Sequence, residues 1–424
     1  MARYKADTYA AILREELIPS LGCTEPSSIA FTAAKARETL GHLPDRCVVE
    51  VSGNMIKNAK SVTVPNTEGM KGIPSATAAG IIAGKSELGL EALQDVTADD
   101  LVKIKKYLDK CEINVIHSDT DALLYIAITV YGKDESACVV TKGGHLNVFS
   151  IEKNGEKLFQ GEEIAETESY ANRDALNIAD IFDFAKHGDI TQLKPIIARQ
   201  IEYNYAISKE GLDNNWGANV GKIMLKTFGD ELIIRAVAAA AAGSDARMSG
   251  CDLPVIIVSG SGNQGITTSV PVIEFAKRLE SPEELLYRAL ILANLVTVHQ
   301  KAGIGRLSAF CGAVSAGCGA AAGIAFLLGG DYDVIAHTIV NALAITSGMV
   351  CDGAKPSCAA KIAVAVHAGL LGYSMYAEGK MQFFDGDGIV QKNVDNTIAN
   401  VARMANLGMR ETDREILRIM TEEG

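Results

Sequence analysis

The chain has 424 residues, of which 48% are hydrophobic and 22% charged, and it contains nine cysteines. Its length allows a large core in one or two domains. The formal net charge of −12 disfavours nonspecific binding to nucleic acid or to anionic membranes. The first twenty residues lack the apolar core of a signal peptide. We therefore expect a cytoplasmic protein whose cysteines are free, catalytic or metal-bound rather than paired.

Residues 1–45 predict two helices with a cysteine between them. Apolar residues recur at helical spacing over residues 4–17, and a second helix with Thr24 as its N-cap follows Cys23. The start of a helix favours a thiolate, so we expect a lowered pKa for Cys23; an inert buried thiol is the alternative. Both helices are expected to pack with the helical lobe described below.

Residues 46–160 predict an α+β lobe with a largely antiparallel sheet. The strand candidates are residues 47–54, 61–67, 111–117, 122–132, 136–143 and 145–155. Residues 72–84 and 97–110 have helical patterns, the second capped by Thr97. Turn residues at 142–144 and 154–155 indicate hairpins.

Residues 161–424 predict a large helical lobe, which makes the fold class α+β. The expected helices lie near residues 173–187, 194–210, 231–243, 282–301, 308–328, 331–346, 358–377 and 394–407, followed by a last helix capped at Thr412. Residues 307–330 carry no charge and are long enough to span a bilayer. Because they are mostly glycine, alanine, serine and cysteine, we favour a buried central helix over a membrane span.

A glycine-rich loop over residues 259–265, SGSGNQG, interrupts the helical lobe. Its G-x-G-x-x-G spacing is a poor indication of dinucleotide binding, because no βαβ unit surrounds it and Pro271 interrupts the helix that would follow. A loop whose backbone N–H groups hold a small carboxylate fits better. A tight turn that needs glycine is the remaining interpretation.

Four of the nine cysteines lie between residues 311 and 358. Cys311 and Cys318 are two helical turns apart, whereas Gly353 lies between Cys351 and Cys358, in a loop that enters a helix. None of the cysteines forms a CxxC pair, which argues against a structural zinc site. This clustering instead suggests a site for a metal cluster.

Five motifs carry a family resemblance that covers essentially the whole chain. They are LGCTEP at 21–26, GNMIKNAKSVTVPNT at 53–67, SGSGNQG at 259–265, CGAVSAGCG at 311–319 and CDGAKPSC at 351–358. In this order they resemble the L-cysteine desulfidase family, which is related to the iron–sulfur L-serine dehydratases.

The resemblance implies a [4Fe–4S] lyase that uses neither pyridoxal phosphate nor NAD. By motif, Cys311, Cys351 and Cys358 would hold the cluster and leave one iron open to substrate, while Cys23 would remove the α-proton. We therefore expect these three sulfurs to converge near Cys23. Cys318 has no transferable role and is expected in the core.

Polar residues inside or beside the motifs are the candidates for substrate binding. They are Asn54, Asn66, Thr67, Ser259, Ser261, Gly262, Asn263 and Arg306. Arg306 suits bidentate binding of a carboxylate, with a helix-end charge as the alternative.

The leading interpretation is a cytoplasmic L-cysteine desulfidase that releases sulfide, ammonia and pyruvate. An L-serine dehydratase with the same site is the alternative, and the absence of a cysteine from the tail LRIMTEEG favours the desulfidase. A non-enzymatic iron–sulfur sensor and a membrane transporter are rivals of other classes. The expected partner is a small amino acid, with no nucleic acid and no membrane, and a homodimer is the default assembly.

Overall fold

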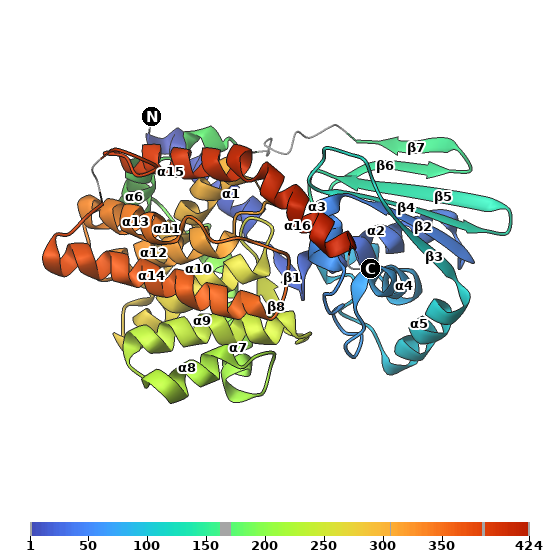
Figure 1. Ribbon diagram of the computed structural model, residues 1–424, viewed down its shortest axis with the longest axis horizontal. Helices are drawn as coiled ribbons and strands as arrows, with labels where there is room; N and C mark the ends of the chain where they lie inside the picture. The colour runs from blue at the N-terminus through green and yellow to red at the C-terminus, as the bar shows by residue number, and fades with distance from the viewer. Residues whose placement is uncertain (1, 162–170, 306, 384–385, 423–424) are drawn as a thin grey trace.

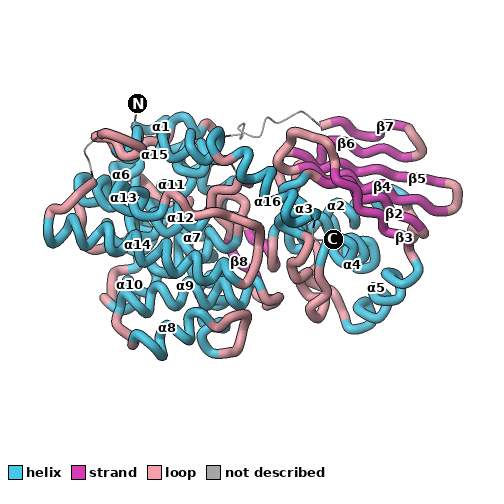
Figure 2. Tube along the Cα trace, viewed as in Figure 1, coloured by secondary structure: helices cyan, strands magenta, loops and turns pink. Residues whose placement is uncertain are grey.

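The computed structural model describes residues 2–161, 171–305, 307–383 and 386–422. Its strands gather at one end of the molecule and most of its helices at the other, which confirms the α+β class (Figures 1 and 2). We call the elements from α2 to β7 the sheet lobe, and we call α1, β1 and the elements from η2 to α15 the helical lobe.

The sheet lobe is built on a six-stranded sheet in the order β3-β2-β4-β5-β6-β7. Its strands are β2 (Arg46–Val51), β3 (Glu112–His117), β4 (Tyr125–Gly132), β5 (Glu135–Lys142), β6 (Val148–Lys153) and β7 (Glu156–Gln160). Its helices are α2 (Thr24–Leu40), α3 (Gly53–Ala59), α4 (Gly72–Ala83), the 3₁₀ helix η1 (Ser86–Glu91) and α5 (Ala98–Lys110). Only β2 and β3 pair in parallel, because α3, α4, η1 and α5 connect them; every other neighbouring pair is antiparallel, as predicted.

Helix α2 packs in the sheet lobe, contrary to the expectation for the N-terminal segment. Ile29, Ala33 and Leu40 share a core with the strand residues Val49 and Ile128. Small residues in α2 and α4 explain this packing: a Cβ on Gly80 of α4 would overlap the backbone of α2. Helix α1 (Ala2–Glu16) packs in the core of the helical lobe, as expected.

The helical lobe forms the second core. Its elements are β1 (Pro19–Leu21), η2 (Arg173–Ala175), α6 (Ile178–His187), α7 (Lys194–Asp213), α8 (Val220–Phe228), α9 (Leu232–Met248), β8 (Pro254–Ile256), α10 (Gly262–Arg278), α11 (Glu283–Ile304), α12 (Gly312–Leu327), α13 (Tyr332–Thr346), α14 (Ser357–Gly379) and α15 (Val394–Arg403). A short π-helix (Met404–Gly408) leads into α16 (Arg410–Glu422), which contacts α3 of the sheet lobe (Figure 1).

The uncharged segment near α12 lies inside the molecule. Almost every residue of α12 is buried, and its glycines let α11 and α14 approach closely: a Cβ on Gly317 would come within 2.7 Å of the α14 backbone. Among the described residues, α14 is the one helix long and apolar enough to cross a membrane, and half of its most apolar stretch is buried inside the protein. Core helices of this kind often have such a composition.

Three local predictions were wrong. Residues 61–67 form no strand, only an isolated bridge from Thr63 to Lys71. Pro271 lies inside α10 without ending it, because buried packing on both sides outweighs the lost hydrogen bond. The last helix begins at Arg410, so Thr412 lies within its first turn and is not its cap.

Candidate functional site

The Cys23 loop lies beside the glycine-rich loop because β1 pairs with β8 in an antiparallel two-stranded sheet. Beyond β1 the chain reaches Cys23, the N-cap of α2; beyond β8 it reaches Ser261, the N-cap of α10. Gly22 makes the first turn possible. Its φ is 58°, and a Cβ there would lie 2.6 Å from Pro65. The starts of α2 and α10 both line the cavity described below.

Cys311 and Cys351 are held on neighbouring segments. Phe310 and Val350 form an isolated antiparallel bridge. The backbone N–H of each cysteine donates to a carbonyl of the opposite segment, over 3.0 Å for Cys311 and 2.7 Å for Cys351. These bonds bring together two cysteines that are forty residues apart in the sequence.

Cys358 lies in the first turn of α14, at the end of a loop that hydrogen bonds and ion pairs hold in place. Its sulfur accepts a hydrogen bond from the backbone N–H of Lys355 at 3.4 Å and lies 3.8 Å from the carbonyl of Gly353. Asp352 accepts hydrogen bonds from the ammonium groups of Lys355 and Lys361, over 2.6 and 2.7 Å. Two cations on one carboxylate therefore fix the loop between Cys351 and Cys358.

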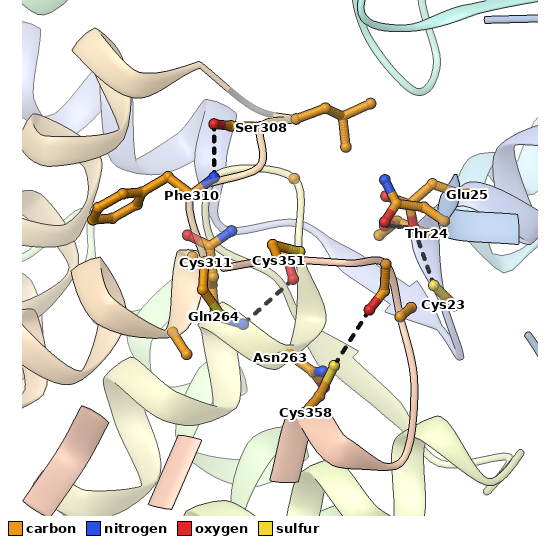
Figure 3. A pocket seen from close by; sticks show the side chains of 18 of the residues that line it. Cys23, Thr24, Glu25, Asn263, Gln264, Ser308, Phe310, Cys311, Cys351 and Cys358 are labelled. Carbon is orange, nitrogen blue, oxygen red and sulfur yellow. Dashed lines mark hydrogen bonds between the residues drawn. The ribbon is translucent and has the colours of Figure 1, made fainter. Parts of the chain in front are cut away.

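These elements enclose a cavity of about 100 Å³ (Figure 3). It is lined by Cys23, Thr24, Glu25, Asn58, Arg247, Gly260, Ser261, Asn263, Gln264, Lys301, Leu307, Ser308, Phe310, Cys311, Gly312, Ala313, Cys351, Gly353, Ala354, Cys358 and Ile362. All four cysteines that the resemblance singles out thus face one space. The fifth motif cysteine, Cys318, is buried elsewhere, with its sulfur 3.7 Å from the carbonyl of Ile339.

Four helices begin at this cavity. Cys23 caps α2, Ser261 caps α10, Cys311 caps α12, and Cys358 is the second residue of α14. The start of a helix carries partial positive charge and unpaired N–H groups. Four of them around a small space favour thiolates and a bound anion.

Cys23 nevertheless differs from the prediction of a lowered pKa. Its thiol donates a hydrogen bond to Glu25 Oε2 at 3.0 Å, and the hydroxyl of Thr24 donates to the same oxygen at 3.0 Å. Burial and the neighbouring Glu25 carboxylate raise the pKa of Cys23 well above its ordinary value, and the Arg247 guanidinium offsets this only in part. The helix start is therefore outweighed by desolvation and by a nearby anion.

Glu25 remains ionised in spite of its burial. Burial by itself raises the pKa of Glu25, but the His145 imidazole and the hydrogen bond from Cys23 lower it to about 2. Nε2 of His145 lies 3.9 Å from Glu25 Oε1, beyond hydrogen-bonding distance. Cys23 therefore faces a permanent carboxylate.

Cys351 has the opposite electrostatic environment. The hydrogen bond from Cys311 lowers the pKa of Cys351, and Lys57 lowers it further, although burial opposes both; the pKa of Cys311 is raised by the same contact. Lys301 also lines the cavity. Burial lowers the pKa of Lys301 to about 8, although both cysteines oppose the shift. The pair is poised to hold one thiolate, the form that binds metals.

The glycine-rich loop accounts for most of the predicted substrate contacts at this cavity. Ser261 and Asn263 line it. Gly262 does not, but it makes room for Arg247, because a Cβ on Gly262 would overlap that guanidinium. Ser259 is buried beside the loop, and its hydroxyl has no partner among the described residues.

The structure does not bring the predicted residues of the second motif to the cavity. Asn54 lines a separate crevice of about 680 Å³ beneath α16. The side chain of Asn66 bonds the carbonyls of residues 93 and 94, and the hydroxyl of Thr67 bonds Val64, so both hold a turn. Arg306 lies outside the described residues.

Sequence reasoning missed several polar residues of the cavity, among them Glu25, Arg247, Gln264 and Lys301. Glu25 and Gln264 lie inside two of the motifs. Arg247 and Lys301 are buried charges near the ends of helices whose buried residues are largely apolar. A charge at such a position is a usable sign of a functional group, since charged residues are rarely buried unless they are paired.

The cavity presents three cysteines on three chain segments, and cysteine is the donor that iron–sulfur clusters use. Over the described part of the chain, no three His, Cys, Asp or Glu side chains converge closely enough to hold one metal ion. Three cysteines on three short, hydrogen-bonded segments, with cations and helix starts around them, suit an iron–sulfur cluster.

These features define a buried, electropositive, cysteine-lined site for a small molecule. Residues 87–418 match the model of a family described as serine dehydratase alpha chain. The chain belongs to this family, which indicates a lyase of the serine dehydratase type.

Similar chains from several bacteria cover almost its whole length. A UPF0597 protein of Desulfitobacterium hafniense is 56% identical over 417 residues, which are 98% of this chain and 97% of that relative. UPF0597 proteins of Lachnoclostridium phytofermentans and Finegoldia magna are 50% and 47% identical, over 96% and 98% of this chain and 98% and 99% of those relatives.

Proposed function

We propose that the protein is a lyase independent of pyridoxal phosphate that converts L-cysteine and water into sulfide, ammonia and pyruvate. The observation that carries this proposal is the meeting of Cys23, Cys311, Cys351 and Cys358 at one small cavity where four helices begin. Membership of the serine dehydratase family supports the reaction type, and the sequence motifs support the substrate.

In this proposal Cys311, Cys351 and Cys358 hold a [4Fe–4S] cluster. Such a cluster, when bound through three cysteines, supplies an iron with an open position that acts as a Lewis acid. The backbone bonds at Cys311 and Cys351 and the Asp352 ion pairs fix the positions of the ligands. The hydrogen bond from Cys311 and the charge of Lys57 favour the thiolate form of Cys351.

Cys23 is the proposed base for the α-proton. It reaches the cavity from the sheet lobe, whereas the three ligand cysteines belong to the helical lobe (Figure 3). Its thiol proton points to Glu25, so the carboxylate orients the group and disfavours its ionisation. Removal of the α-proton and departure of sulfide leave aminoacrylate, which water converts to pyruvate and ammonia.

L-Serine is the second candidate substrate, because the matching family is described as serine dehydratase alpha chain. The same groups would then release water in place of sulfide. The two substrates differ only in the leaving atom.

The deciding experiment is an assay of the full chain, purified and reconstituted with iron and sulfide under anaerobic conditions. With L-cysteine we expect equal amounts of sulfide and pyruvate, and with L-serine much less pyruvate. Pyruvate from L-serine without sulfide from L-cysteine would identify a dehydratase. No product from either amino acid would refute a lyase.

A further inference from the structure

The cavity wall carries a buried cation whose hydrogen bonds are incomplete. Arg247, near the end of α9, is 3% exposed. Its Nη1 donates to Asn263 Oδ1 at 3.1 Å, whereas Nε and Nη2 are buried and have no partner among the described residues. These two atoms form one edge of the guanidinium, the edge that binds a carboxylate through two parallel hydrogen bonds.

No carboxylate of the described residues forms an ion pair with Arg247. The positive charge of Arg247 acts to lower the pKa of Cys23 and of Cys358, although other effects raise both values overall. Neither sulfur accepts a hydrogen bond from Arg247. An unpaired buried charge is costly, so its retention needs a reason. A negatively charged ligand in the cavity supplies one.

Gln264 offers a complementary group on the same wall. It is 5% exposed, and its Oε1 is buried and accepts no hydrogen bond from the described residues. The amide lies against the start of α12, where a Cβ on Gly312 would come within 2.7 Å of its Cδ. The side chain is therefore held in place beside Cys311, with an acceptor that needs a donor.

We infer that Arg247 and Gln264 form the binding site for the two charged groups of a small α-amino acid. The Nε–Nη2 edge of Arg247 takes the carboxylate, and Oε1 of Gln264 accepts a hydrogen bond from the α-ammonium. The inference rests on the proposed function, because that function supplies the reaction of the bound amino acid. Binding of the amino acid can be measured without turnover.

Close packing holds the two side chains of this site in place. Gly262 and Gly312 leave the room that the Arg247 and Gln264 side chains occupy. Cys23, Cys311, Cys351 and Cys358 line the same cavity, so a small amino acid held by Arg247 and Gln264 would lie beside them.

The test uses ligands that cannot undergo elimination. Calorimetry on the anaerobically reconstituted full chain would compare L-alanine with L-alaninamide, which lacks the carboxylate, and with propionate, which lacks the ammonium. We expect L-alanine to bind about 10- to 100-fold more tightly than either, because each comparison removes a charge-assisted hydrogen bond. Equal binding of the three ligands, or no binding of L-alanine at millimolar concentration, would overturn the inference without any variant.

Variants then assign the two halves of the site. Arg247→Lys and Arg247→Met should abolish the preference for L-alanine over L-alaninamide, and Gln264→Met should abolish the preference over propionate. Arg235→Met is the matched control, since Arg235 lies on the same helix and pairs with Asp230 at 2.5 Å on the surface. A wild-type pattern of preferences in the Arg247 and Gln264 variants would contradict the assignment.

The outcome is separable from that of the lyase proposal. If L-cysteine yields no sulfide while the alanine preference depends on Arg247, the binding site stands and the desulfidase proposal fails. If sulfide is released and KM for L-cysteine is unchanged in Arg247→Lys, the lyase stands and this assignment fails. The assignment predicts that KM rises at least about tenfold in that variant.

Discussion

Cys47 and Cys111 of the sheet lobe are buried, as are Cys23 and Cys311 of the cavity, but the two groups lie in different electrostatic surroundings. Sγ of Cys47 lies 3.8 Å from Sγ of Cys111 and 3.4 Å from the hydroxyl of Tyr107, inside the apolar core of the sheet lobe. Burial raises the pKa of Cys47, and the neighbouring Cys111 raises it further, although the Tyr107 hydroxyl opposes the shift. Nothing in this core favours a thiolate.

In the cavity, burial also acts to raise the pKa of the half-buried Cys351, yet the hydrogen bond from Cys311 and the charge of Lys57 lower it. The starts of four helices face the same space. Burial therefore does not decide whether a cysteine can serve as a ligand or a nucleophile; the charges and dipoles that accompany burial decide it. The following predictions test this contrast, from the largest expected effect to the smallest.

Loss of a ligand should have the largest effect. Cys311→Ala, Cys351→Ala and Cys358→Ala should each lose the visible absorbance of the reconstituted cluster, its iron and all activity above background, because two thiolates do not retain it. Cys111→Ala is the matched control in the sheet lobe and should keep full iron content. Full iron in all three cavity variants would contradict the ligand assignment.

Replacement of Cys23 should separate chemistry from cluster binding. Cys23→Ala should retain iron and absorbance but lower kcat by about 10²–10⁴-fold, the usual contribution of a general base. Measurement of kcat by sulfide release, with iron determined on the same sample, checks both halves. Loss of iron in this variant would instead make Cys23 a fourth ligand.

The raised pKa of Cys23 predicts a pH profile. A base must be deprotonated to act, so below its pKa the rate constant kcat/KM should rise about tenfold per pH unit from pH 7 upward. Glu25→Gln removes the anion that raises this pKa and should move the profile to lower pH. A flat profile between pH 7 and 9, or no displacement by Glu25→Gln, would show that Cys23 does not govern the reaction.

A sheet-lobe cysteine should affect only stability. Cys47→Ala removes a fully buried sulfur from the core and should lower the free energy of unfolding by about 1–2 kcal/mol. Chemical denaturation checks this value, and kcat should be unchanged. A loss of iron in Cys47→Ala would contradict the distinction between the cysteines of the sheet lobe and those of the cavity.

Much of the fold follows from local pattern. The alternation in β2, β4 and β5 and the periodicity of α11 and α13 were sufficient to predict the sheet and the helical lobe. The position of α2 was not predictable from local pattern. Its sequence pattern indicates a helix but does not specify in which of the two cores the helix packs. The prediction at Pro271 failed for a similar reason. The lost backbone hydrogen bond is a local cost, whereas the packing that offsets it comes from other parts of the folded chain.

At the site, motifs predicted the cysteines but not their electrostatics. Cys23 precedes a helix in the sequence, and that alone suggested a lowered pKa. The opposing effect comes from burial and from Glu25, whose orientation toward the sulfur depends on the folded loop. Asn66 and Thr67 were misassigned because polar residues in a motif can equally hold a turn.

The most direct test of the account compares Cys23→Ala with Cys351→Ala, each reconstituted anaerobically, for iron content and for sulfide release from L-cysteine. The proposed roles predict a full cluster with kcat lowered by about 10²–10⁴-fold in Cys23→Ala, and neither cluster nor turnover in Cys351→Ala. Undiminished sulfide release by Cys23→Ala, or equal loss of iron in both variants, would contradict these roles.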